Sequence, residues 1–221
     1  MSIRIAPSLL SADFSRLADE VADVERAGAD LLHLDIMDGH FVPNLTFGPA
    51  VVRAIASRSK IALDAHLMVT NPDDLIDDLL AAPVARIAVH VEVCDHLQRT
   101  LENIRTGGAA AGVAINPASA LSLLEDALPW TDFVLVMSVN PGFGGQAFIP
   151  ETLEKISRLR EMAGGRPLDI AVDGGVCLEN VASLANAGAT TLVAGSAILG
   201  LEDRASAIAG LRLAETVGGN Q

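Results

Sequence analysis

The sequence predicts a (β/α)8 barrel of the TIM-barrel class, and three observations support this prediction. Short apolar runs alternate with amphipathic segments of helical period eight times along the 221 residues. No stretch rich in Pro, Gly and Ser breaks the alternation, so residues 1–221 are expected to form a single domain. The first run is followed by "PSLLSADF" instead of the glycine-rich turn that a doubly wound dinucleotide-binding sheet requires. The barrel is therefore favoured over the doubly wound sheet.

The predicted strands are rich in Val, Ile, Leu and Ala, as expected for parallel strands that are buried on both faces. They are residues 3–9, 31–36, 61–68, 86–91, 112–116, 133–139, 168–172 and 191–194. The predicted helices place apolar residues three or four positions apart. They are residues 13–27, 49–57, 72–82, 96–106, 119–127, 150–163, 178–187 and 205–215. Pro72 and Ser119 are typical of helix starts, and Gly28, Gly107 and Gly188 are typical of helix ends.

The composition limits the partners of the chain. There are 15 Lys and Arg against 28 Asp and Glu, and the net charge of -13 argues against nucleic acid or a membrane as a partner. Cys94 and Cys177 are far apart and in no CxxC spacing, so they indicate neither a zinc knuckle nor a disulfide framework. The N-terminal residues do not read as a signal peptide, and no apolar run approaches the roughly 20 residues that span a bilayer. A cytoplasmic protein is expected.

Unusual polar residues lie at the carboxyl ends of predicted strands, where barrels carry their chemistry. His33 and Asp35 are two positions apart and share one face of a strand, His66 is near the end of the next strand, and Asp173 follows residues 168–172. A single strand histidine is more often a hydrogen-bonded core residue, and an Asp before two glycines is often only a turn residue. Four such residues at three strand ends predict a site for one divalent metal ion, with nitrogen and oxygen ligands that suit zinc, iron, manganese or cobalt.

Three methionines and a further aspartate share this end of the predicted barrel. Met37, Met68 and Met137 have two interpretations, as core filler or as a soft apolar lid over a bound intermediate. Asp64 lies on the same face as His66 and one layer deeper. It either orients a ligand histidine or points towards a helix with a partner of its own.

Glycines follow each of the last three predicted strands, as "NPGFGGQ" at 140–146, "DGGV" at 173–176 and "AGSA" at 194–197. Loops after the last strands of a barrel, with a short helix N-terminus, bind phosphate through backbone N–H groups, and glycine lets the backbone come close. Amides can therefore hold an anionic substrate in an acidic protein. The long-range field should then slow capture, so that the on-rate rises with added salt. Residues 141–145 are also a candidate closing flap.

The remaining residues narrow the chemistry. Lys60 precedes a strand and Lys155 lies inside a predicted helix, so neither is placed to form a Schiff base. There is no GxSxG or Walker motif, and no nucleotide cofactor is expected. Asp35 and Asp173 come from strands on opposite sides of the mouth, which suits the removal of a proton from one face of a carbon and its return to the other. Together with a metal, they predict proton abstraction beside a carbonyl of a small phosphorylated sugar, through an enediolate.

The chain resembles the ribulose-phosphate 3-epimerase family along essentially its whole length. The resemblance is carried by the blocks "APSLLSADF", "HLDIMDGHFVPNLTFGP", "DAHLMV", "VNPGFGGQAF", "VDGGV" and "VAGSAI". It implies a single catalytic TIM-barrel domain of the ribulose-phosphate-binding type. It also implies an isomerase of the pentose phosphate pathway that interconverts D-ribulose 5-phosphate and D-xylulose 5-phosphate through a 2,3-enediolate. The resemblance further implies a homo-oligomer.

Site residues follow from the resemblance by position. The metal ligands would be His33, Asp35, His66 and Asp173, with Asp35 as proton acceptor and Asp173 as proton donor. The substrate-binding residues would be Ser8, His66, Gly142, Phe143, Gly144, Gly145, Asp173, Gly174, Gly175, Gly195 and Ser196. Leu199 stands where the family often has Phe, and Ala147 lies at a variable position. Neither departure touches the proposed chemistry.

Three alternatives remain open at this point. A 3-epimerase for a six-carbon ketose, such as allulose 6-phosphate, would share these motifs and differ in pocket length. A lyase on the same scaffold, such as a hexulose-phosphate synthase, would release formaldehyde. A non-catalytic sugar-phosphate sensor would have no need of the opposed pair Asp35 and Asp173.

Overall fold

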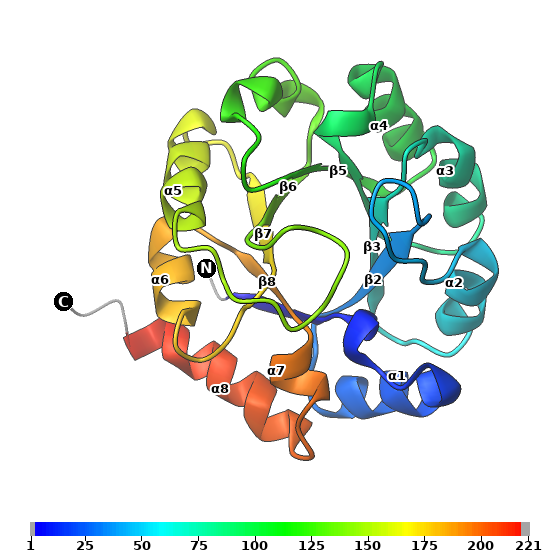
Figure 1. Ribbon diagram of the computed structural model, residues 1–221, viewed down its shortest axis with the longest axis vertical. Helices are drawn as coiled ribbons and strands as arrows, with labels where there is room; N and C mark the ends of the chain where they lie inside the picture. The colour runs from blue at the N-terminus through cyan, green and yellow to red at the C-terminus, as the bar shows by residue number, and fades with distance from the viewer. Residues whose placement is uncertain (1–2, 218–221) are drawn as a thin grey trace.

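The computed structural model describes residues 3–217 and shows eight parallel strands that curl into a barrel inside a ring of helices (Figure 1). The strands are β1 Arg4–Pro7, β2 Leu31–Met37, β3 Ala62–Met68, β4 Arg86–His90, β5 Ala110–Ile115, β6 Phe133–Met137, β7 Asp169–Asp173 and β8 Thr191–Ala194. Their order, β1-β8-β7-β6-β5-β4-β3-β2, follows the chain around the barrel. All carboxyl ends therefore meet at one rim, and the predicted (β/α)8 fold is confirmed.

Helices cover the outside of the sheet (Figure 1). They are α1 Leu17–Arg26, α2 Pro49–Ala56, α3 Asp73–Leu80, α4 Leu97–Thr106, α5 Thr152–Met162, α6 Val181–Ala187, α7 Ser196–Leu199 and α8 Arg204–Val217. Within the described residues, five short 3-10 helices lie in the connections: η1 Leu9–Ser11, η2 Phe14–Arg16, η3 Val91–Val93, η4 Leu121–Leu124 and η5 Leu128–Trp130. None of the helices within residues 3–217 is long and apolar enough to cross a membrane.

Two apolar layers stabilise the barrel. The larger one lies between strands and helices and includes Leu34, Val52 and Ile87. A smaller cluster, dominated by Ala and Leu side chains, fills the inside of the barrel. Its widest member is Phe133, whose ring occupies the space beside Gly112, since a Cβ there would lie 2.2 Å from the ring. The inside is thus a packed core, and the open space is confined to the rim.

The seam between β1 and β2 brings the first strand to the site. The two strands meet at a single bridge between Ser8 and His33. Below it, the Asp30 carboxylate accepts a hydrogen bond from the Ile5 amide at 2.7 Å, and the Asp30 amide donates to the Ile5 carbonyl at 3.0 Å. The Asp30 side chain thus replaces part of the backbone hydrogen bonding between β1 and β2. Ser8 is thereby placed beside β2.

The structure corrects three of the predicted elements. Residues 119–127 do not form an α-helix but contain η4, and Pro129, which lacks an amide proton, follows in the separate 3-10 helix η5. Residues 14–16 of the predicted first helix form η2, which Asp13 caps by accepting a hydrogen bond from the Ser15 amide. The first strand ends at Pro7 because Ser8 caps η1. The short helix α7 was not predicted as an element.

Candidate active site

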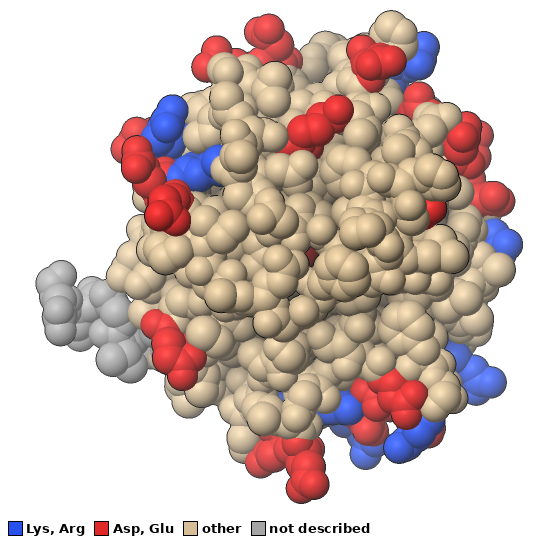
Figure 2. All heavy atoms as spheres, viewed as in Figure 1, with Lys and Arg blue, Asp and Glu red and all other residues tan. Residues whose placement is uncertain are grey.

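A pocket of about 350 Å³ opens at the carboxyl ends of the strands. Its lining includes Ser8, Asp35, Met37, Met68, Met137, Gly142, Phe143, Gly144, Gly145, Asp173, Gly174, Gly175, Gly195 and Ser196. The space-filling view shows a narrow opening at the centre of this face, with acidic atoms at its bottom and uncharged residues around it (Figure 2). Among the described residues that line the pocket there is no lysine or arginine. Every predicted substrate-binding residue except the deeper His66 lines this pocket.

Four potential metal ligands converge at the bottom of the pocket. His33, Asp35, His66 and Asp173 each offer one ligand atom, and these atoms lie within 4.8 Å of one another. Within the described part of the chain, Nε2 of buried His33 has no hydrogen-bond partner. Two nitrogens and two carboxylate oxygens around an unsatisfied buried lone pair fit a divalent cation.

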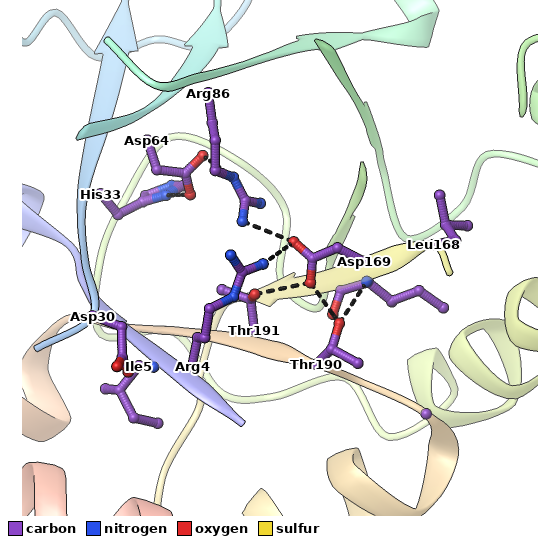
Figure 3. Close-up of polar contacts among 12 residues, drawn as sticks. Arg4, Ile5, Asp30, His33, Asp64, Arg86, Leu168, Asp169, Thr190 and Thr191 are labelled. Carbon is purple, nitrogen blue, oxygen red and sulfur yellow. Dashed lines mark hydrogen bonds and ion pairs between the residues drawn. The ribbon is translucent and has the colours of Figure 1, made fainter. Parts of the chain in front are cut away.

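His33 is oriented by a charged network, buried at its upper end, that runs down through the barrel (Figure 3). Its Nδ1 lies 3.0 Å from Oδ2 of Asp64, and Oδ1 of the same carboxylate lies 3.2 Å from Nε of Arg86. Arg86 reaches on to Asp169 at 2.7 Å, and Arg4 pairs with the same carboxylate. Since a carboxylate accepts, Nδ1 carries the proton and Nε2 is left free to bind a metal. Asp64 thus contacts a candidate ligand histidine, in line with the first interpretation of this residue.

The carboxylates around His33 favour positive charge at this histidine. Burial lowers the pKa of this histidine, but the carboxylates of Asp35 and Asp64 outweigh burial and raise the pKa well above its ordinary value. Burial raises the pKa of Asp64, and Arg86, followed by His33, lowers it below its ordinary value. Asp64 is therefore held as an anion under the cluster, which favours a cation above it.

Asp35 and Asp173 have opposite electrostatic surroundings. Burial raises the pKa of Asp35, but the charge of His33, followed by polar contacts with His33 and His66, lowers it well below its ordinary value. The Ser8 hydroxyl donates to this carboxylate as well. Burial, followed by the Asp35 charge, raises the pKa of Asp173 to about 7. Near neutral pH the pair therefore holds one base and one group ready to carry a proton.

The β7 loop is built for close approach of backbone to a ligand. Gly174 and Gly175 have φ angles of 121° and 62°, which L side chains rarely adopt. A Cβ on Gly175 would lie 2.6 Å from the Phe148 amide nitrogen. The Ser138 hydroxyl fixes the turn through the carbonyl oxygens of Asp173 and Gly174, at 2.9 and 2.6 Å. Side chains are thus excluded from this wall.

The candidate flap, residues 141–145, lies across the mouth of the barrel between β6 and α5 (Figure 1). Asn44 donates from Nδ2 to the Gly142 carbonyl at 3.0 Å and ties the flap to the loop after β2. The side-chain amide of Gln146 donates to the carbonyls of Asn140 and Phe143. Three side-chain hydrogen bonds therefore hold the flap over the pocket.

The structure adds His90 and Glu92, which were not among the predicted site residues. Nε2 of His90 lies 2.8 Å from Nε2 of His66, and Nδ1 of His90 lies 3.1 Å from Oε2 of Glu92. Burial lowers the pKa of His90 to about 4 and also lowers that of His66, so both rings are neutral at pH 7. His90 ends β4, so the strand-end rule that selects His66 would have found it. Ser138 and Asn44 carry no such signal, because they act through hydrogen bonds between distant loops.

The fold and the cluster together define the class of protein: a TIM-barrel enzyme with a His/Asp centre able to hold a divalent metal ion. Residues 4–199 match the model of the ribulose-phosphate 3 epimerase family. The chain is 51% identical over 215 residues to ribulose-phosphate 3-epimerase of Synechocystis sp., covering 96% of this chain and 94% of that protein. It is 47% identical over 213 residues to the Bacillus subtilis enzyme of the same name, with coverage of 95% and 98%. The chain belongs to the ribulose-phosphate 3-epimerase family, and it is an isomerase.

A solved structure of 3-hexulose-6-phosphate synthase superposes with a TM-score of 0.68 and 20% sequence identity, covering 97% of this chain and 99% of that one. At this identity the likeness shows the shared fold alone. The family match thus favours an epimerase over the lyase alternative.

Proposed function

We propose that this single catalytic domain interconverts D-ribulose 5-phosphate and D-xylulose 5-phosphate by moving a proton at C3. The observation that carries the proposal is the pair Asp35 and Asp173 within a four-ligand cluster, at the bottom of a pocket whose walls are largely backbone. A pocket of about 350 Å³ is of the size that holds one small ligand. The family membership supplies the substrate class, a phosphorylated ketose.

Asp35 and Asp173 carry the proton transfer. Asp35, which is held as a carboxylate, removes the proton from C3 on one face of the sugar. Asp173, whose pKa of about 7 lets it carry a proton near neutral pH, returns a proton to the opposite face, and the two exchange roles in the reverse direction. Ser8 keeps the Asp35 carboxylate oriented through its hydroxyl. The inversion at C3 follows because acceptor and donor act from different faces.

His33, Asp35, His66 and Asp173 would hold the metal. When bound, a divalent cation supplies positive charge close to the sugar oxygens on which negative charge develops during proton removal. Zinc, iron, manganese and cobalt all suit this donor set. Met37, Met68 and Met137 line the pocket above it and would exclude water from the enediolate.

The glycine loops hold the phosphate. Backbone N–H groups of Gly174, Gly175, Gly195 and Ser196 replace the basic side chains that the pocket lacks, with residues 142–145 closing from the other side. Such amides bind a dianion without adding a cation to the site.

The test is incubation of the purified protein with ribulose 5-phosphate in deuterated water, followed by NMR. Xylulose 5-phosphate with deuterium at C3 is expected to form, to be suppressed by a chelator and to return when a divalent metal is added back. Parallel incubation with allulose 6-phosphate measures the six-carbon alternative, and a formaldehyde assay measures the lyase. Binding of the sugar phosphate without exchange at C3 would support the sensor and contradict the proposal.

A further inference from the structure

A second hydrogen-bonded chain reaches the cluster from β4 and the loop after β5. It runs from Glu92 to His90 and from His90 to His66. We propose that His90 and Glu92 are positioning residues that fix the tautomer of His66, so that Nδ1 of His66 presents a lone pair to the metal site. The inference deepens the proposed function, on which it rests for the identity of the four ligands.

Glu92 determines which atoms donate in the hydrogen bonds from Glu92 through His90 to His66, because Glu92 itself is held as an acceptor. Its Oε1 accepts from the Asn116 amide at 2.8 Å and from the Ser119 hydroxyl, and its Oε2 faces His90 at 3.1 Å. Burial raises the pKa of Glu92, but these hydrogen bonds, led by that of His90, hold the pKa at about 2. A carboxylate with three donors has no proton to give, so Nδ1 of His90 donates to it.

The acceptor role of Glu92 then fixes the donor and acceptor nitrogens of both imidazole rings. In neutral His90 with a proton on Nδ1, Nε2 is bare and can only accept. The Nε2–Nε2 distance of 2.8 Å to His66 requires one proton between the rings, and His66 must supply it. Nδ1 of His66 is therefore bare, 3.1 Å from Oδ1 of Asp35 and 3.8 Å from Oδ2 of Asp173. A lone pair that faces two carboxylates is well placed to bind a cation.

The far end of the chain is anchored. Nζ of Lys155 donates to the carbonyls of Asn116, Pro117 and Ser119, at 2.8, 2.6 and 2.8 Å, and so fixes the loop that holds Glu92. The Phe41 ring packs on His90 with a centroid distance of 4.6 Å. The hydrogen bonds between Glu92, His90 and His66 therefore have little freedom to reverse their direction, because both Glu92 and the His90 ring are held in place.

The two ligand histidines are therefore set in complementary ways. His33 donates from Nδ1 directly to Asp64, which leaves Nε2 for the metal. His66 donates from Nε2 through His90 to Glu92, which leaves Nδ1. Each ring reaches a carboxylate, one in a single step and the other through an intervening ring, and both point their free nitrogens into the same cluster.

The decisive variant is Glu92→Gln, because a side-chain amide can accept from Asn116 and Ser119 while its NH2 group donates to His90. This change reverses both relay hydrogen bonds and places the proton of His66 on Nδ1. We expect the affinity for Co²⁺, measured by competition with a chromogenic chelator, to fall about 10- to 100-fold. In metal-stripped protein, the ¹⁵N NMR shifts of His66 should report a bare Nδ1 in the original chain and a protonated Nδ1 in the variant. Glu125→Gln is the matched control, since it removes the same charge from an exposed position nearby.

A second pair keeps the test decisive if Glu92→Gln does not fold. His90→Leu removes the acceptor and should weaken Co²⁺ binding similarly, whereas His90→Gln, whose carbonyl can accept from Nε2 of His66, should restore most of it. Unchanged affinity in His90→Leu, or the same His66 tautomer with and without Glu92, would overturn the proposal. If the original chain itself binds no Co²⁺, the proposed metal site fails, and the NMR arm still decides the tautomer separately.

Discussion

At the scale of single residues, the site depends on two carboxylates of the same chemistry in different states. Asp35 receives a hydrogen bond from the Ser8 hydroxyl and is stabilised as an anion. Burial, followed by the Asp35 charge, instead raises the pKa of Asp173 to about 7. A pair whose pKa values are driven apart is the arrangement that assigns one base and one acid near neutral pH.

Substituting Asp173 by Asn should abolish epimerisation while sugar-phosphate binding largely survives. The amide is isosteric but cannot deliver a proton, and general acid–base groups contribute about 100- to 10,000-fold to rates. Turnover would be followed with a coupled assay for xylulose 5-phosphate, and binding of ribulose 5-phosphate by calorimetry with the metal content checked. Full turnover of the variant would remove Asp173 from the proposed role.

Truncating His33 to Ala should release the metal. The change removes a nitrogen ligand whose lone pair has no partner among the described protein groups. The loss of affinity should exceed the roughly 10- to 100-fold effect of removing an outer partner of a ligand. Elemental analysis of the purified variant measures this, with His96→Ala, an exposed histidine, as the control. Equal metal content in the two variants would contradict the ligand assignment.

At the scale of elements, strand ends and loops have different roles. The strand ends position the candidate metal ligands, and the loops line the pocket for the substrate. Alternation of apolar runs predicted the strands well, because parallel strands buried on both faces leave a strong signal. Residues 119–127 were wrongly predicted as a helix, because local periodicity does not register the proline at 129 that follows. His90 ends a correctly predicted strand. Its role could not be read from the sequence, because it depends on a ring-to-ring distance of 2.8 Å.

The β7 loop can be tested with Gly175→Ala. A Cβ there meets the Phe148 backbone at 2.6 Å, so the loop must shift and its amides leave the phosphate. We expect KM for ribulose 5-phosphate to rise about 10-fold, equivalent to about 1.4 kcal/mol of lost binding. Gly165→Ala is matched, since Gly165 also has a positive φ angle, 83°, but nothing lies within 4 Å of its Cβ position. Equal KM values in the two variants would show that the positive φ angle alone, and not the contact with Phe148, accounts for any change, and would contradict the proposed role of the β7 loop.

The floor of the barrel can be tested with Arg86→Met. Arg86 pairs with Asp64 and Asp169, and removing it leaves two largely buried carboxylates without their main partner. The free energy of unfolding in urea should fall by about 3–5 kcal/mol, as for other broken buried pairs. Arg53→Met breaks an exposed pair with Asp78 and should cost less than about 1 kcal/mol. A similar small cost for Arg86→Met would show that the network is not needed for stability.

At the scale of the whole molecule, barrel topology explains why the site residues were largely predictable from the sequence. It also explains why the charged network beneath them was not. All carboxyl ends of parallel strands meet at one rim, so residues as distant as His33 and Asp173 could be grouped from the sequence alone. The inward network of Arg4, Arg86 and Asp169 lies towards the opposite ends of the strands, where no such rule selects polar residues. Its members were therefore not predicted, although they determine the charge under the cluster.

The net charge of -13 and the amide-built pocket lead to a prediction about capture of substrate. An acidic protein repels a sugar phosphate at long range, and the repulsion is screened when the Debye length falls from about 30 Å at 0.01 M salt to about 10 Å at 0.1 M. The on-rate should therefore rise a few-fold over this range, measured by stopped flow in potassium chloride, because sulfate would compete for the amides. Turnover at saturating substrate serves as the control and should change little. An on-rate that falls with salt would mean that the positive ends of the loop amides control capture, and that the surface acids lie too far from the mouth to matter.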